Sequence, residues 1–268
     1  ATAVVVGGGF IGLEVAENLT ERGIKVTIVE KMPQVMAPFD FEMAQLVHQQ
    51  LNLHGIDLIL NDGVKSFANN GRNVNLDSGK VLNTDMIILA IGVAPDSSLA
   101  KAAGLSLGPK GHIVTTDQMR TIDAKTNEVV NDVYAIGDAV QIKDFVSKTD
   151  TAVALAWGAN RQGRIVADVV NGIDNRFNGS MGTSALKLFN MVIASVGNNQ
   201  RTLESKKIPF VAIHAQRGNH ASYYPGATDI AMKLCFNPKT GEILGAQAIG
   251  QEGTEKRIDV IATAIKLK

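Results

Sequence analysis

The sequence predicts an α/β protein, with a parallel sheet early in the chain and a separate α+β domain at its end. Strand-like and helix-like segments alternate through residues 1–60, and this alternation produces right-handed crossovers in a parallel sheet. From Gly182 onward the pattern changes to several apolar strands and one closing helix. With 268 residues, the chain is long enough for about two domains of about 150 residues each.

The elements of the first part follow from hydrophobic periodicity. Apolar strands are predicted at residues 3–6, 25–29 and 57–60, and helices at 11–22 and 40–54. Between residues 64 and 82 the period drops to two, with turn signals at 69–71 and 77–79, so a β-meander is expected. A buried strand at 86–90 then completes the parallel sheet.

The later part of the chain is less regular at first. A short strand at 132–135 and a long helix at 154–171 are predicted within residues 111–178. The closing α+β part has strands at 184–189, 192–197, 208–214, 229–236 and 243–249 and a helix at 254–267. We therefore expect three domains, at residues 1–108, 109–178 and 179–268.

Composition excludes several classes of function. The 26 basic residues balance the 26 acidic residues, so charge gives no reason to expect binding to nucleic acid or to an anionic membrane. No apolar run is long enough to span a membrane, no signal peptide is expected, and the cytoplasm is the predicted location. The single cysteine, Cys235, is not enough for an internal disulfide or a thiolate-rich metal site, so no metal is predicted.

Residues 2–30 carry the most informative motif. A β-branched run ends at Val6 and leads into Gly7-Gly-Gly-Phe-Ile-Gly12, a helical pattern follows, and a second apolar strand ends at Glu30. Strand, glycine turn, helix, strand and terminal acid in one unit form the dinucleotide-binding fingerprint of a Rossmann-like domain. The alternative reading is a glycine turn that only packs a helix on a strand.

Each residue type in the fingerprint has a physical role. Gly7 permits the tight turn, Gly9 lets the backbone approach the pyrophosphate, and Gly12 lets helix and strand pack closely. Glu30 can accept hydrogen bonds from the adenosine ribose, which favours NADH over NADPH, although Lys31 beside it could tolerate a phosphate. The candidate dinucleotide-binding residues are Gly7, Gly9, Phe10, Ile11, Gly12, Glu14, Glu30, Lys31, Ile91 and Gly92.

Two later motifs resemble a known family. Val133-Tyr-Ala-Ile-Gly-Asp-Ala139 and the helical stretch 155–164 are similar to flavin-binding segments of the pyridine nucleotide–disulfide oxidoreductases. The resemblance implies that Asp138, next to Gly137, holds a ribitol hydroxyl of FAD. It also implies that the helix start at Leu155, Ala156 and Trp157 faces the pyrimidine edge of the flavin, where a helix N-terminus stabilises negative charge. Ala154 and Gly158 depart from the prolines that relatives often have nearby.

The stretches 220–227 and 250–260 indicate a particular group within this family. They are similar to the interface domain of coenzyme A-disulfide reductases and related NADH-dependent persulfide reductases and oxidases. This implies a homodimer in which Tyr223 or Tyr224 is a catalytic residue that reaches the partner's active site. A phenol with a pKa of about 10 can donate a proton to a departing thiolate. The plainer alternative is a Tyr-Pro-Gly turn, and the sequence does not decide which tyrosine acts.

The family begins with an FAD-binding half that carries a single redox cysteine, and this sequence starts at the later NAD loop. Cys235 lies in an apolar strand without a helix N-terminus or base beside it, so it is predicted to be structural. We therefore expect a fragment that also lacks the family's closing segment. FAD would belong to the intact parent protein and be absent from the fragment.

The favoured interpretation is part of an FAD-dependent NADH:disulfide oxidoreductase that passes hydride from NADH to flavin and electrons on to a small thiol disulfide or persulfide. An NADH oxidase or peroxidase of the same family is the alternative, and the tyrosine-bearing stretch favours the first. For the isolated chain a third reading is a non-catalytic nucleotide-binding and dimerisation module. The sequence leaves the true electron acceptor open.

Overall fold

The computed structural model describes residues 1–267, and the chain divides into two compact units. The first unit contains Ala1–Gly92, Ala185–Ser195 and the chain from Asn199 onward. The second contains Val93–Ser184 and Val196–Asn198. The domain boundaries at residues 108 and 178 stay predictions. Within residues 1–267, no helix combines the length and apolar character needed to cross a bilayer.

The first unit begins with the predicted parallel sheet, which has the strand order β3-β2-β1-β7. Its strands are β1 (Thr2–Val6), β2 (Lys25–Val29), β3 (Asp57–Ile59) and β7 (Met86–Leu89), all paired in parallel. Helices α1 (Phe10–Glu21) and α2 (Phe41–Leu53) are the crossovers. The predicted β-meander is present as β4 (Val64–Ala68), β5 (Asn73–Leu76) and β6 (Val81–Asn83). The α/β prediction for this part is confirmed.

The closing part of the chain forms a five-stranded sheet with the order β13-β14-β17-β16-β15. Its strands are β13 (Ser184–Leu188), β14 (Met191–Gly197), β15 (Val211–Gly218), β16 (Asp229–Phe236) and β17 (Ile243–Gly250). Helix α6 (Thr254–Leu267) packs on β17. Strand β15 begins and ends later than the predicted 208–214, because its pairing with β16 runs from Val211 opposite Phe236 to Gly218 opposite Asp229.

A short helix, α5 (Gln200–Ser205), was not predicted. Its six residues are too few to show a helical period, but its cap is clear: the side chain of Asn199 accepts a hydrogen bond from Thr202 N at 2.8 Å. Such a cap satisfies one of the backbone donors that every helix start leaves unpaired. The helix therefore begins at a fixed residue, which matters for the contacts described below.

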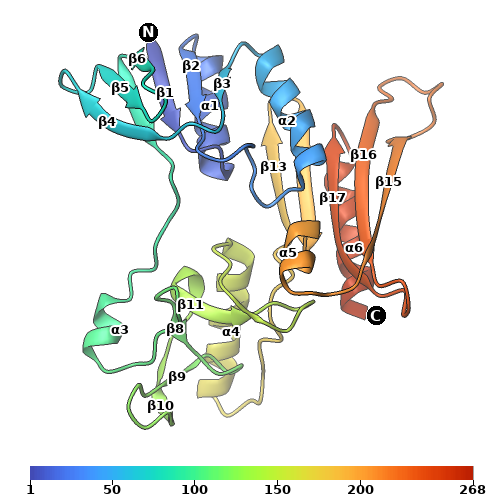
Figure 1. The fold of residues 1–268 in the computed structure, drawn as a ribbon. Coiled ribbons are helices and arrows are strands. Elements are labelled where there is room, and N and C mark those ends of the chain that lie inside the picture. Colours follow the sequence, from blue (N-terminus) through green and yellow to red (C-terminus); the bar gives the residue numbers. More distant parts are fainter. Residues whose placement is uncertain (268) are drawn as a thin grey trace. The chain divides into compact units, whose positions relative to one another are not determined.

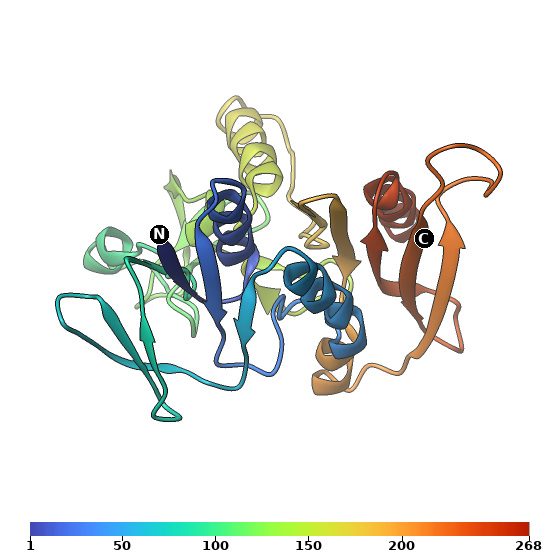
Figure 2. The same cartoon turned by 90° about the horizontal axis from the view of Figure 1, so that it is seen from above.

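One hydrophobic core joins the parallel sheet and the closing sheet of the first unit. Helix α2 contributes Met43, Val47 and Leu51 to a cluster that also contains residues from β1, β2, β13, β14 and β17. Both ribbon views show α2 between the parallel sheet and the closing sheet (Figures 1 and 2). Because burial of each large apolar side chain contributes about 1.5–3 kcal/mol, this shared core stabilises both sheets.

The second unit is built from short elements and one long helix. These are α3 (Ser98–Ala102), β8 (Ile113–Val114), β9 (Arg120–Ile122), β10 (Val129–Tyr134), η1 (Gly137–Ala139), β11 (Val140–Lys143), β12 (Asp150–Thr151) and α4 (Ala156–Val170). The predicted helix at 154–171 is α4. The predicted strand at 132–135 is the end of a longer strand, β10, which pairs with β9 through a bulge. Its core contains Met119, Ile142, Ile165 and Phe177.

Candidate functional site

A cavity of about 580 Å³ lies in the first unit, at the carboxyl ends of β1, β2 and β7. Strand β1 stands between β2 and β7, so the strand order reverses there, and parallel sheets bind ligands at such a point. The lining includes the predicted residues Gly7, Gly9, Glu30, Lys31, Ile91 and Gly92. The structure therefore brings together residues from both ends of the predicted nucleotide-binding part.

The glycine turn has the backbone geometry that its fingerprint implies. Gly7 has φ = +107°, and a Cβ atom there would lie 2.3 Å from the carbonyl oxygen of Ala90. A Cβ atom on Gly12 would lie 2.0 Å from the carbonyl oxygen of Gly7. By contrast, a Cβ atom on Gly9 would meet nothing within 4 Å. Gly7 and Gly12 thus allow close backbone packing, and Gly9 presents bare backbone to open space, where a pyrophosphate would fit.

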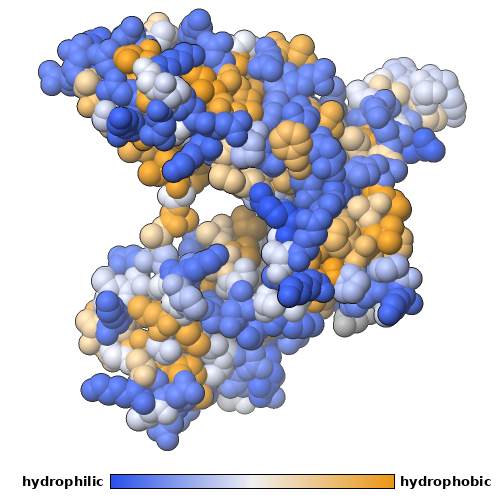
Figure 3. Space-filling view, in the orientation of Figure 1, coloured by the Kyte–Doolittle hydropathy of each residue, from blue (hydrophilic) through white to orange (hydrophobic). Residues whose placement is uncertain are grey.

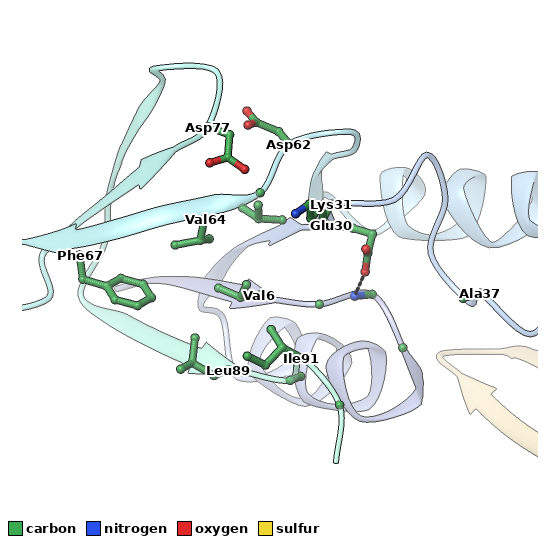
Figure 4. A pocket seen from close by; sticks show the side chains of 17 residues that line it. Val6, Glu30, Lys31, Ala37, Asp62, Val64, Phe67, Asp77, Leu89 and Ile91 are labelled. Carbon is green, nitrogen blue, oxygen red and sulfur yellow. Dashed lines mark hydrogen bonds between the residues drawn. The ribbon is translucent and has the colours of Figure 1, made fainter. Parts of the chain in front are cut away.

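The carboxylate of Glu30 is anchored at the end of β2. It accepts hydrogen bonds from Gly8 N at 2.7 Å and from Met32 N at 2.8 Å, the first of which is drawn in Figure 4. The sequence predicts only the ribose contact for this side chain, and not these two backbone contacts. Each carboxylate oxygen can accept more than one hydrogen bond, so these contacts orient Glu30 and leave acceptor capacity for a ligand hydroxyl.

The β-meander supplies further residues of the cavity wall that sequence reasoning missed. Asp62 is buried and accepts hydrogen bonds from Ser78 N at 3.0 Å and Ser78 Oγ at 2.6 Å. Asp77 lines the same wall, and Figure 4 shows the two carboxylates close together above Val64. Both aspartates lie outside the strands and in no binding motif, so only the three-dimensional pairing of the meander reveals them.

Apolar side chains complete the cavity wall. Phe67, Leu89 and Ile91 line the cavity and are exposed. The space-filling view shows hydrophobic surface among polar surface over the strands of this unit (Figure 3). A cavity with apolar walls and a few placed polar groups suits a flat aromatic ring attached to sugars and phosphates.

The predicted residues Phe10, Ile11 and Glu14 lie in the first turns of α1, directly after Gly9. Gly9 is the N-cap residue of this helix, so the helix start follows the open face of the glycine turn. Backbone N–H groups of the first helical turn have no intrahelical partners, and the dipole favours a negative charge there. The arrangement can therefore hold a phosphate without a positively charged side chain.

The predicted flavin-binding residues lie in the second unit. Gly137, with φ = +83°, begins η1, and its N–H group donates to Gln162 Oε1 at 2.7 Å, which joins η1 to α4. Asp138 follows in η1. Leu155 is the N-cap residue of α4, and Ala156 and Trp157 line a second cavity of about 470 Å³ with Arg161 and Arg164. Asp138 and the start of α4 are thus on adjoining elements.

Tyr223 and Tyr224 lie in the loop between β15 and β16, and they are 89% and 65% exposed. The base of the loop is closed by Asn219, whose N–H donates to the carbonyl of Thr228 at 2.9 Å. The ring of Tyr224 meets the ring of His220 edge to face, with 5.6 Å between their centroids. Both phenols are therefore presented outward from a closed loop.

Cys235 has the character of a structural cysteine. It is buried in β16, and burial raises the pKa of its thiol to about 11. A thiol with that pKa is protonated at neutral pH and is a poor nucleophile. The prediction that Cys235 is structural agrees with these properties.

A buried ionic cluster was also missed by sequence reasoning. The ammonium group of Lys233, whose side chain is 1% exposed, lies 3.0 Å from Asp40 Oδ2, 2.5 Å from Glu42 Oε1 and 2.9 Å from Gln200 Oε1. Burial lowers the pKa of Lys233, but the hydrogen bonds and charges of Glu42 and Asp40 outweigh it and hold the pKa above its ordinary value. Burial likewise raises the pKa of Glu42, but its hydrogen bonds from Lys233, a backbone N–H and His214, together with the charge of Lys233, outweigh burial, so that pKa is lowered. Lys233 and Glu42 are therefore both charged at neutral pH.

Comparison with known proteins identifies the class. Residues 1–163 match the family described as pyridine nucleotide-disulphide oxidoreductase, and residues 183–268 match the dimerisation domain of the same family. The chain belongs to this family, whose enzymes use FAD and a nicotinamide dinucleotide. The family prediction and the predicted α/β and α+β fold class are confirmed.

Individual relatives show which members of the family this chain resembles. The chain is 34% identical over 263 residues to coenzyme A disulfide reductase from Staphylococcus aureus, which covers 98% of this chain and 58% of that protein. The structure of reduced Bacillus anthracis CoADR-RHD superposes with a TM-score of 0.94 at 50% identity, over 99% of this chain and 47% of the other. An NAD-dependent persulfide reductase from A. fulgidus gives a TM-score of 0.93 at 33% identity, over 99% and 48%. The chain thus spans 58% of the length of the curated relative.

Proposed function

We propose that this chain is part of an FAD-dependent NADH:disulfide oxidoreductase whose electron acceptor is a small thiol disulfide or persulfide. The observation that carries the proposal is the cavity at the carboxyl ends of β1, β2 and β7, where the glycine turn presents open backbone at Gly9. The similarity to coenzyme A disulfide and persulfide reductases supports the choice of acceptor. When bound, the flavin would take hydride from NADH and pass electrons toward the acceptor.

Within this function, the residues of the first unit bind and orient the dinucleotide. Gly9 and the start of α1 hold the pyrophosphate through backbone N–H groups, while Gly7, whose N–H donates to the carbonyl of Val29 at 2.8 Å, forms the tight turn. Glu30, oriented by its bonds from Gly8 and Met32, accepts hydrogen bonds from the adenosine ribose. In the second unit, Asp138 and the start of α4 would hold the ribitol and the pyrimidine edge of FAD. This assignment is supported by Gly137, whose positive φ turns the backbone beside Asp138.

We propose that NADH is the preferred dinucleotide. Three carboxylates line the cavity, from Glu30, Asp62 and Asp77, against one ammonium group, from Lys31. A 2′-phosphate would add negative charge to a wall that already carries an excess of it. The acidic wall therefore outweighs Lys31.

Calorimetric titration of the chain should show NADH binding at least about tenfold tighter than NADPH, a difference of about 1.4 kcal/mol. Glu30→Gln should reduce this preference because a neutral amide repels the phosphate less. Asp77→Asn should reduce it too, and this variant keeps the Gly8–Glu30 hydrogen bond intact. Asp57→Asn removes an exposed carboxylate from outside the cavity and is the matched control. Equal affinity of the unaltered chain for both dinucleotides would show that Lys31 offsets the repulsion of the 2′-phosphate by the acidic wall.

We propose that the 268-residue chain, expressed by itself, retains no stoichiometric FAD. Its residues supply the ribitol and pyrimidine side of a flavin site, and the family resemblance assigns the adenosine side to a different half. Most of the ligand surface that a cofactor site normally buries would then be missing. The purified chain should be colourless, with no visible flavin absorbance after denaturation. A yellow protein with one FAD per chain would contradict this.

We propose that the parent protein is a homodimer, with its two-fold interface in residues 183–268. The match of these residues to the family's dimerisation domain supports this proposal. Val211 and Ile213 of β15 are exposed, and Figure 3 shows hydrophobic surface over this part of the closing sheet. Symmetric dimers are the commonest closed assembly and need a self-complementary surface of this kind. The single unpaired thiol fits a reducing compartment, so we propose a cytoplasmic location.

Two alternatives remain to be tested against this proposal. Reduction of oxygen or peroxide would use the same dinucleotide and flavin sites, and the exposed tyrosine loop favours a thiol-containing acceptor over it. For the isolated chain, we propose a non-catalytic role as a nucleotide-binding and dimerisation module.

A further inference from the structure

The glycine turn of the dinucleotide cavity is supported by a neighbouring loop, residues 34–40. Met36 N donates to the carbonyl oxygen of Gly8 at 2.8 Å, and Ala37 lines the cavity. Gly8 packs so closely on this loop that a Cβ atom there would lie 2.6 Å from Cγ1 of Val35. The position of Gly8, between Gly7 and Gly9, therefore depends on the position of this loop.

Loop 34–40 adopts a backbone conformation that its surroundings must maintain. Met36 has φ = 51°, in the left-handed region that non-glycine residues rarely adopt. Such a residue costs about 1 kcal/mol or more and persists only where neighbouring contacts determine it. Part of the support is local, since Gln34 Nε2 donates to the carbonyl of Phe39 at 2.9 Å and Val35 N donates to His48 Nε2 at 3.1 Å.

The remaining support comes from the part of the chain that matches the dimerisation domain. Asn199 Nδ2 donates to the carbonyl of Pro38 at 2.9 Å, and the guanidinium group of Arg201 donates to the carbonyl of Ala37. Asp40 N donates to Gln247 Oε1 at 2.8 Å, and Gln247 Nε2 donates back to Asp40 Oδ2 at 2.6 Å. Three backbone positions of this short loop, at Ala37, Pro38 and Asp40, are thus hydrogen-bonded by side chains from the closing part of the chain.

We propose that the dimerisation region positions the phosphate-binding turn through loop 34–40, with Asn199 and Arg201 as positioning residues. Their side chains donate hydrogen bonds to one side of the loop. The other side of the loop is hydrogen-bonded to Gly8 and lines the cavity. The affinity for a dinucleotide would then depend on residues that donate hydrogen bonds to the loop and do not contact the nucleotide. This inference rests on the proposed function, because it takes the cavity as the dinucleotide site.

The test uses the full chain and two substitutions that spare the fold. Asn199→Ser keeps an oxygen that can cap α5 but is too short to reach Pro38, and Arg201→Ala removes an exposed side chain. The double variant should bind NADH about tenfold more weakly by calorimetry, as expected from the loss of two hydrogen bonds to the loop. Its melting temperature should stay close to that of the control variant.

The matched control is Gln50→Ala. This variant also breaks a hydrogen bond between the parallel-sheet part and the closing part, from Gln50 Nε2 to Asn190 Oδ1 at 2.6 Å, but it does not touch loop 34–40. Its NADH affinity should equal that of the unaltered chain. Replacing Arg201 by lysine in the Asn199→Ser background should recover part of the affinity, because an ammonium group can still donate to Ala37.

Hydrogen exchange provides a second measurement of the loop, and this measurement does not require NADH. The amide of Met36 should exchange faster in the double variant than in the unaltered chain, whereas the amide of Glu30, bonded to Ile59, should not change. An NADH affinity of the double variant equal to that of the unaltered chain would overturn this inference and leave the proposed function standing. Failure of the unaltered chain to bind NADH would overturn both.

Discussion

Phenylalanine in place of one of Tyr223 and Tyr224 is expected to slow disulfide reduction by the parent enzyme by about 10²–10⁴-fold. In the proposed function, one phenol donates a proton to the thiolate that leaves when the acceptor disulfide is cleaved. Phenylalanine keeps the ring and loses the hydroxyl group, so proton donation is lost while the shape of the loop is kept. The loss corresponds to about 3–5 kcal/mol of barrier.

The structure predicts that these substitutions affect disulfide reduction and leave folding and flavin reduction unchanged. Both side chains are exposed, and the loop is closed by the backbone pairing of Asn219 with Thr228, so neither hydroxyl group is needed for folding. Reduction of the flavin by NADH and the melting temperature should therefore stay near their wild-type values in both variants. The tyrosine that does not act is the matched control for the one that does.

The measurement is steady-state turnover with coenzyme A disulfide and with a persulfide, beside a stopped-flow measurement of flavin reduction by NADH. If both variants turn over both acceptors at the wild-type rate, the two tyrosines only form a turn, and oxygen or peroxide becomes the better acceptor. If flavin reduction slows as much as turnover, the loop acts on the dinucleotide step instead.

The parts of the fold that could be predicted are those with local signals. The strands around the glycine turn, helix α2 and the β-meander each follow from a hydrophobic period within one segment and from turn residues at its ends. The glycine fingerprint also located one side of the cavity, because close backbone approach at Gly7 and Gly12 is a property of the local turn.

The other side of the cavity depends on contacts between distant segments. Asp62 and Asp77 reach the wall only after β4 and β5 pair, and loop 34–40 is held by residues such as Gln247, 207 positions from Asp40. The elements of the second unit that were missed, such as β8 and β12, have two residues each and show no period. Lys233 stands within an otherwise apolar run in β16, and the sequence gives no sign of the carboxylates that pair with it.

Replacing Lys233 with methionine is expected to lower the free energy of unfolding by about 3–5 kcal/mol, because it leaves a buried carboxylate without its cation. The side chain of Asp40 is 6% exposed and keeps only its hydrogen bonds from Gln247 and Gln200 N once the ammonium group is gone. Methionine is similar in length, so the loss comes from charge rather than from a cavity. Denaturant unfolding, followed by circular dichroism, measures the change.

Two further variants separate this mechanism from a general loss of a lysine. Lys25→Met breaks the exposed pair with Asp57, whose side chains are 69% and 60% exposed, and should change stability by no more than about 1 kcal/mol. Adding Asp40→Asn to Lys233→Met should restore part of the lost stability, because the buried group is then neutral. If Lys233→Met is no less stable than Lys25→Met, the buried ion pair of Lys233 with Asp40 does not stabilise the fold.

The charges of the cluster determine how the loss of stability caused by Lys233→Met depends on pH. The pKa of Glu42 is lowered from its ordinary 4.5, so its contribution is present above that pH and is lost as the pH falls through the folded-state pKa. The pKa of Lys233 is raised from 10.5, so its contribution is complete below that pH and is lost only as the pH rises through the folded-state value. The stability difference between the unaltered chain and Lys233→Met should therefore be constant around neutral pH. It should narrow in acid, where protonation removes the unpaired negative charge of the variant, and a difference that widened in acid would contradict a charged cluster.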